Sequence, residues 1–253
     1  MENYFDAAPP RETKEITQNI NVVADGISVV GLIISVLLLI NWESHSLHVL
    51  FDLLCLSFHL FSVIKDIFPN FTVGSNILPK LILCPDFHHL TMCLLFYIAG
   101  ISSFIHVFMY VIEFGVRSLI FVQNKIIPNT SLHGNPLIDN VMDFIANPFI
   151  SSLPSYLEIA LGFYLLYNSF VNFTLMSWIV LIVYMVWIIA FNFAASEVHS
   201  RTWTSVSLWL REFAAQNAET FGPKLELAVD KFSEFANKVA KVYPSKEIKV
   251  HLQ

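Results

Sequence analysis

The most constraining feature of this sequence is the stretch from Phe173 to Ala195, which contains no charged residue. The hydrocarbon core of a bilayer is ~30 Å thick, and an α-helix needs about 20 apolar residues to cross it. A soluble protein can bury a helix that is apolar on every side only within a large core. Here 55% of all residues are hydrophobic and only 13% are charged, whereas a soluble domain carries about 25% charged residues. The sequence therefore predicts an all-α, polytopic membrane protein.

Pairs of apolar runs separated by short polar turns predict short transmembrane helical hairpins. They lie in a membrane domain, residues 22–195, which follows a polar N-terminal tail, residues 1–21. The charge-free part of the first arm, residues 27–40, has only fourteen residues, fewer than the ~20 of a comfortable span. The predicted hairpins are 22–64, 88–122 and 154–195.

The middle apolar run, from Leu90 to Val122, allows two structures. Its 33 residues could form one long tilted helix or a tight hairpin that turns near Gly100. With three hairpins and a cytosolic N-terminus, all 14 Lys and Arg residues fall on one side of the membrane. Cytosolic loops hold the excess of Lys and Arg, so this distribution favours the hairpin and predicts that both termini are cytosolic.

Amphipathic helices are expected beside the membrane domain. Residues 136–146 begin with Pro136, which suits the first position of a helix, and they place apolar residues opposite Asp139 and Asp143. This pattern predicts a helix on the membrane surface. Residues 196–253 are expected to be cytosolic and to hold two further amphipathic helices, divided at Gly222-Pro223, before a short basic tail.

The two C-terminal helices could bury their apolar stripes against each other or insert them into the headgroup layer. Their content of Trp and Phe favours the membrane for the first helix, because aromatic residues are enriched at membrane interfaces. The residues that would contact the membrane surface are Trp203, Trp209, Phe213, Leu225, Val229, Phe232, Phe235 and Val239.

Polar residues within the apolar runs are the other candidates for function, because they are costly in lipid. Asp52 lies one helical turn after His48, so these two could form an intramembrane hydrogen bond. Glu158 lies near the end of its apolar run, where it can reach water. The nine histidines do not have the spacing of a metal site, and no phosphate loop, HExxH or nucleophile motif is present. We therefore expect no catalytic residue, cofactor or metal ion.

Two segments carry a family likeness. One is Phe144-Ile-Ala-Asn147, with Pro154 shortly after it; the other is His89-Leu-Thr-Met-Cys-Leu-Leu-Phe96, which leads into a long apolar run with a break near its middle. With the paired spans and the amphipathic end, the chain resembles the transmembrane protein 33 family, including yeast pore-membrane relatives, over about residues 25–225. It departs from the family in its long acidic N-terminus and its second C-terminal helix.

The resemblance implies residence in the endoplasmic reticulum and nuclear envelope, a role in shaping tubular membrane, and partners among reticulon-type proteins and nuclear pore components. It implies no catalytic residue. Short spans and surface helices would also enlarge the cytosolic leaflet relative to the lumenal one and favour positive curvature.

The expected function is thus that of a non-enzymatic membrane protein that shapes or senses curvature and scaffolds partner proteins. Its first partner would be the lipid bilayer, and no contact with nucleic acid is expected. Two alternatives stay open. One is a membrane-embedded, lipid-modifying metalloenzyme that uses His48, His88, His89 and Asp52. The other is a structural subunit of a larger membrane complex, in which other chains cover the apolar surface.

Overall fold

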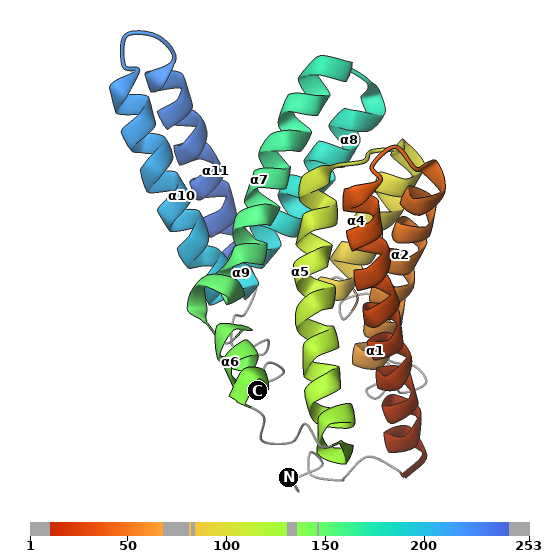
Figure 1. Cartoon of the computed structure of the whole chain (residues 1–253). Helices are drawn as coiled ribbons and strands as arrows, with labels where there is room; N and C mark the ends of the chain where they lie inside the picture. Colours follow the sequence, from red (N-terminus) through yellow and green to blue (C-terminus); the bar gives the residue numbers. More distant parts are fainter. Residues whose placement is uncertain (1–10, 68–80, 82–83, 131–135, 146, 243–253) are drawn as a thin grey trace, which may run out of the picture. The chain divides into compact units, whose positions relative to one another are not determined.

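The computed structural model of the protein describes residues 11–67, 81, 84–130, 136–145 and 147–242 (Figure 1). Within these residues the chain forms helices and no strand, and four of the helices are long and apolar enough to cross a membrane. The predicted all-α, polytopic membrane fold is therefore confirmed. The chain forms two compact units, Met1–Asn135 and Pro136–Gln253, and their boundary falls inside the range 22–195.

The four candidate spans have full length. They are Asn19–Ile40, His45–Ile67, Phe104–Ile126 and Leu175–Ala194, with 22, 23, 23 and 20 residues. Each span meets the requirement of about 20 residues. The helices are longer than the charge-free runs because they continue through polar residues such as Asp25 and Lys65. These four helices are not shorter than the bilayer core, so their length does not produce a difference between the leaflets.

The first unit is a helical bundle built around aromatic side chains. It contains α1 (Arg11–Ile40), α2 (His45–Ile67), α4 (Pro85–Ala99) and α5 (Phe104–Phe121), and α5 continues through η2 (Val122–Ile126) and η3 (Ile127–Asn129). Helix α1 packs against α2 and α5, and α2 packs against α4 (Figure 1). The rings of Phe58 and Phe114 meet edge to face, 5.2 Å apart between centroids, which is a favourable geometry for aromatic pairs. At most 2% of the side chain is exposed at Phe51, Phe58, Phe96, Tyr110 and Phe114.

The long apolar run between residues 90 and 122 consists of two helices in this structure. Helix α4 ends at Gly100, whose φ of 62° lies in the left-handed region that glycine adopts readily. Cys93 contacts Tyr110, and Phe96 contacts His106, so α4 and α5 run in opposite directions. With 15 residues, α4 is about 22 Å long at 1.5 Å per residue, too short to cross the hydrocarbon core.

Small residues allow α1 to lie close to its neighbours. One buried face of the helix carries Ala24, Ser28, Gly31 and Ser35. The hydroxyl groups of Ser28 and Ser35 donate to the carbonyl oxygens of Ala24 and Gly31, at 2.9 Å and 2.7 Å. Both serines therefore satisfy their polar atoms within their own helix. Small residues at this spacing let backbones approach closely in membrane proteins.

The second unit contains two helical hairpins. Helix α7 (Pro148–Asn172) pairs with α8 (Leu175–Val183), and α10 (Glu197–Gln216) pairs with α11 (Gly222–Val242). The short helix α9 (Phe191–Ala195) contacts both α10 and α11, and α6 (Pro136–Ile145) precedes α7. The turn from α7 to α8 contains Phe173 with a φ of 44°, followed by Thr174, whose hydroxyl accepts the amide of Ser177 at 3.1 Å and caps α8.

A π-helical turn, η4 (Tyr184–Ala190), lies inside the span that begins at Leu175. It joins α8 to α9 without interrupting the helical path. Three consecutive residues of this turn, Ile188, Ile189 and Ala190, are buried, although a regular α-helix with one packed face would bury only some of three successive positions. The π turn therefore widens the packed face of the span where it meets α7 and α11.

Substitution of Gly31 tests the close packing of α1. A Cβ atom at Gly31 would lie 2.6 Å from the ring of Phe114, which is fully buried. We expect Gly31→Ala to lower the free energy of unfolding in detergent by about 1–3 kcal/mol, as overpacking does. Gly26→Ala is the matched control, because a Cβ there has nothing within 4 Å. It should raise stability by about 0.5–1 kcal/mol. Equal effects of the two substitutions would contradict this account of the packing.

Candidate functional site

The residues expected at the membrane surface divide between the interior and the exterior of the C-terminal hairpin. Trp203 and Val229 are buried, with 7% and 4% of their surface exposed. The ring of Trp203 lies 4.6 Å from that of Phe232, and its Nε1 donates to the Ser233 hydroxyl at 3.3 Å. Val239 is half-buried. Much of the apolar stripe thus packs within the protein, which is the first of the two arrangements considered for this helical pair.

A cluster of exposed aromatic rings lies toward the closed end of the same hairpin. Trp209 stacks on Phe213 with 5.8 Å between ring centroids, and Phe213 lies 5.7 Å from Phe221. Their exposed fractions are 60%, 39% and 44%. We call Trp209, Phe213 and Phe221 the aromatic tip. Phe235 is also exposed but lies on α11, next to Phe232.

A polar cluster, which we call the polar joint, connects the two hairpins of the second unit. A carboxylate oxygen of Glu158, on α7, lies 3.1 Å from Nδ1 of His199, on α10, and accepts the side-chain amide of Asn192, on α9, at 3.1 Å. The Tyr184 hydroxyl donates to the main-chain carbonyl of Glu158 at 2.9 Å. Glu158 and His199 are 8% and 1% exposed. The expectation that Glu158 reaches water is wrong, because α7 begins ten residues earlier, at Pro148, and places Glu158 inside the unit.

His199 also leaves one polar atom buried. Its Nε2 has no hydrogen-bond partner among the described residues, which costs free energy in the folded state. The main-chain amide of His199 donates to the Ser196 hydroxyl at 3.3 Å, which caps the start of α10. The polar joint therefore fixes the direction in which α10 leaves the membrane hairpin.

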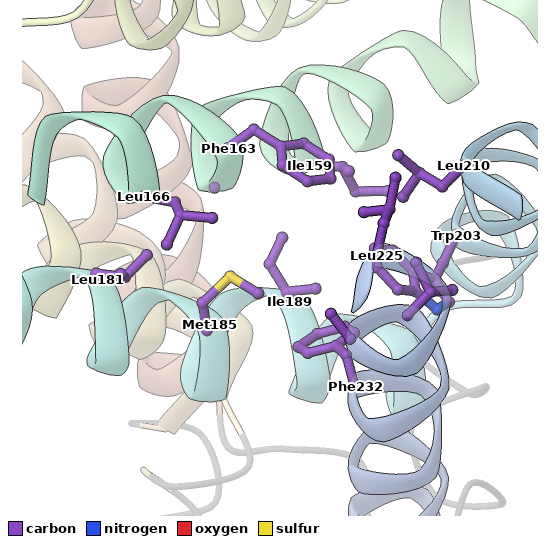
Figure 2. Close-up of a pocket in the computed structure, with 13 residues that line it drawn as sticks. Ile159, Phe163, Leu166, Leu181, Met185, Ile189, Trp203, Leu210, Leu225 and Phe232 are labelled. Carbon is purple, nitrogen blue, oxygen red and sulfur yellow. The ribbon is translucent and has the colours of Figure 1, made fainter. Parts of the chain in front are cut away.

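An apolar cavity of about 230 Å³ lies between the two hairpins (Figure 2). Its walls come from α7, from α8 and η4, and from α10 and α11, and every residue that lines it is apolar. Leu225 and Phe232, two of the residues expected at the membrane surface, face this cavity (Figure 2).

The first unit contains a chain of buried polar contacts across three helices. Asp86, at the start of α4, lies 2.9 Å from Nδ1 of His59 on α2. Nε2 of His59 lies 2.5 Å from the Tyr110 hydroxyl on α5, which lies 3.2 Å from the Cys93 sulfur. If His59 is neutral and donates to Asp86, then Tyr110 donates to His59 and the Cys93 thiol donates to Tyr110. With this arrangement of donors and acceptors, each of the four side chains has at least one hydrogen-bond partner.

The environment of Asp86 keeps it ionised. Burial alone would raise its pKa, but the hydrogen bond from His59 and electrostatic interactions with His59, His89 and Arg117 lower the pKa below the ordinary 3.8. A carboxylate whose pKa falls on folding stabilises the protein above its ordinary pKa. This contribution is lost as the pH falls through the lowered pKa of the folded state.

His48 and Asp52 do not form the hydrogen bond that their spacing suggested. Nε2 of His48 lies 2.8 Å from the carbonyl oxygen of Trp42, and Nδ1 lies 3.3 Å from the Ser102 hydroxyl. Both ring nitrogens thus have other partners, which lie at the two turns α1–α2 and α4–α5. His48 holds these turns together, which the sequence could not indicate because Ser102 is 54 residues away.

His88 and His89 both lie on α4. His89 stacks on His59 with 5.2 Å between ring centroids, and His88 is buried. Among the described residues, no group of three or more His, Cys, Asp or Glu side chains could hold a metal ion. The three cysteines are free and buried.

Comparisons of this chain with models of protein families, with curated proteins and with solved structures find no match.

Removal of the Tyr110 hydroxyl tests the buried polar chain. Tyr110→Phe leaves Nε2 of His59 without its partner in a fully buried position, so we expect a loss of about 1–3 kcal/mol in the free energy of unfolding. Tyr97→Phe removes the same atom from a side chain that is 44% exposed and should be nearly neutral. Chemical denaturation of both variants in one detergent compares their free energies of unfolding. An unchanged free energy in Tyr110→Phe would show that the buried polar contacts contribute nothing to stability.

Substitution of His199 tests the polar joint. His199→Ala removes the contact with Glu158 and leaves its buried carboxylate with fewer partners. We expect hydrogen–deuterium exchange at the first two turns of α10 to accelerate about tenfold or more, since a lost buried contact costs ~1–3 kcal/mol. Ser200→Ala, one residue further along the same helix, should leave the exchange rates unchanged. Identical protection in the two variants would show that the polar joint does not hold α10.

Proposed function

We propose that this integral membrane protein is not an enzyme and that it shapes or senses membrane curvature through its C-terminal hairpin. The observation that supports this proposal best is the aromatic tip. Trp203, Leu210 and Val229 of the hairpin are buried, whereas the rings of Trp209, Phe213 and Phe221 stack together at the surface. Leu208, Leu227 and Phe235 add further exposed apolar area to the hairpin. Exposed apolar clusters of this kind mark sites of interaction.

The surroundings of the aromatic tip suit the headgroup layer of a membrane. Trp is enriched at the boundary between lipid and water, and amphipathic helices of this type lie in that layer with their charged face outward. On α11, Lys238 and Lys231 bind Glu234 and lower its pKa below the ordinary value. Between residues 223 and 243, four Lys residues oppose three acidic residues. Attraction to anionic lipid is therefore weak, and apolar contacts would supply the membrane affinity.

A hairpin inserted into one leaflet enlarges that leaflet alone and favours curvature toward it. Helix α6 adds to this effect in the proposal, because Phe144 on this short helix is 63% exposed. The asymmetry then comes from surface helices, and full-length spans such as Leu175–Ala194 serve as anchors.

Location and partners form a further part of the proposal. Residence in the endoplasmic reticulum and nuclear envelope, and partners among reticulon-type proteins and nuclear pore components, follow from the resemblance to the transmembrane protein 33 family alone. The cytosolic position of both termini follows from the distribution of Lys and Arg. Labelling of each terminus in sealed vesicles would test it, and termini on opposite faces would refute this topology.

Reconstitution of the full chain into liposomes tests the role of the aromatic tip. We expect the wild type to convert spherical liposomes into tubules, as observed by electron microscopy. The triple variant Trp209→Ser, Phe213→Ser and Phe221→Ser should lose most of this activity, because it removes the inserted apolar volume. The conservative variant Trp209→Phe, Phe213→Trp and Phe221→Trp is the matched control and should retain it.

The same assay includes the outcomes that oppose the proposal. Equal tubulation by the serine variant would exclude the aromatic tip from the mechanism, and equal tubulation by a chain truncated after Ala195 would exclude the whole hairpin. A wild type that tubulates nothing, but is purified in mild detergent with another chain at fixed stoichiometry, would instead support a structural subunit of a larger complex.

A further inference from the structure

We propose that the cavity between the two hairpins of the second unit binds an acyl chain of a bilayer phospholipid. This inference goes beyond curvature and does not depend on it, because it rests on the chemistry and the depth of the cavity.

The lining of the cavity selects hydrocarbon. Ile159 and Phe163 on α7, Met185 and Ile189 on η4, and Trp203 and Phe232 on the C-terminal hairpin point into it (Figure 2). The one polar side-chain atom among its lining residues, Nε1 of Trp203, already donates to Ser233. A cavity without free polar groups does not hold ordered water, and an apolar cavity of ~150 Å³ can bind benzene. The present volume of about 230 Å³ therefore has room for a longer segment of alkyl chain.

The position of the cavity places it beside the hydrocarbon of the membrane. Leu181, Met185 and Ile189 form one wall, and all three belong to the candidate span Leu175–Ala194. The walls reach the surface, since Phe163 and Leu166 are 44% and 40% exposed. From there the surface of α7 continues with exposed apolar side chains such as Tyr167 and Phe170. The cavity thus lies next to an exposed apolar surface of α7 and to a candidate span, and acyl chains of the leaflet that the hairpin contacts are the apolar material available there.

The polar joint indicates from which end the acyl chain enters the cavity. Glu158 is next to Ile159 on α7, Asn192 follows Ile189 by one turn, and His199 precedes Trp203 by one turn. The joint therefore lies at one end of the cavity on all of these segments. Its buried, bonded side chains close that end to hydrocarbon. The acyl chain enters from the opposite end, toward Leu166 and Leu181.

Quenching of Trp203 fluorescence tests this proposal. The chain has five Trp residues, so replacement of Trp42, Trp178, Trp187 and Trp209 by Phe leaves Trp203 as the single reporter. In liposomes of phosphatidylcholine with brominated acyl chains, we expect the emission of Trp203 to fall at least about twofold relative to unbrominated lipid. Trp203 is 7% exposed and lines the cavity, so a bromine atom on an acyl chain inside the cavity would lie close to its ring.

A filled cavity provides the matched comparison. Ala228→Phe adds a ring at the cavity wall and should remove most of the quenching, whereas Ala215→Phe on the exposed side of α10 should leave it unchanged. Gly162→Leu fills the cavity from the opposite wall, where a Cβ lies 3.4 Å from the sulfur of Met185, and should act like Ala228→Phe. Circular dichroism and thermal melts identify any variant that fails to fold.

Three results would overturn the proposal. The first is an unquenched Trp203 in liposomes that do quench a variant retaining only Trp178, which lies in the candidate span. The second is equal quenching in the filled and unfilled variants, which would place the bromine outside the cavity. The third is absence of quenching in the protein with Trp203 as its single reporter, when that protein forms a dimer in the liposomes. This result would mean that a second copy of the protein occupies the cavity.

Discussion

Polar side chains that are buried among apolar helices must find their partners within the protein, because hydrocarbon offers none and an unpaired polar group is costly. This requirement determines much of the structure. In the first unit it links Asp86, His59, Tyr110 and Cys93 across α2, α4 and α5. In the second it links Glu158 to His199 and Asn192. Each set of contacts can form in only one register of the helices that contribute to it.

Apolar packing then follows the register that the polar contacts specify. His59 contacts α4 and α5 at the same time, and the rings of Phe58 and Phe114 meet one residue away from these bonds along α2 and one turn away along α5. Apolar helices in lipid gain little from mutual burial, because lipid tails are as apolar as the side chains. Close fit and directed bonds must therefore provide the specificity, and Gly31 beside Phe114 is an example of the fit.

The sequence predicted those features that depend on neighbouring residues. The helical class and the span near Phe173–Ala195 follow from local hydropathy, the start of α11 at Gly222 follows from the Gly-Pro pair, and the turn at Gly100 follows from one residue that tolerates positive φ. The polar contacts could not be predicted, because their partners are 27 and 51 residues apart in the first unit. Nothing in a single sequence pairs them.

The C-terminal hairpin shows a second limit. A stripe of apolar residues at helical spacing indicates which face is apolar but not what covers it. The stripe predicts membrane contact for both Trp203 and Trp209, yet Trp203 is buried against Phe232 and Trp209 is exposed. The pattern does not predict the exposed Phe221, because this residue lies in the turn and belongs to no helical stripe.

The π turn at Tyr184–Ala190 has a mechanical consequence for the whole second unit. A regular α-helix advances by about 100° per residue, and a π turn accommodates one extra residue within a turn. If η4 relaxed to regular α-helix, everything beyond it would rotate by about that angle about the axis of the span. Asn192 would then swing away from Glu158, and the base of α10 would turn with it. The π turn thus determines the rotational position, about the axis of the span, of the hairpin that follows.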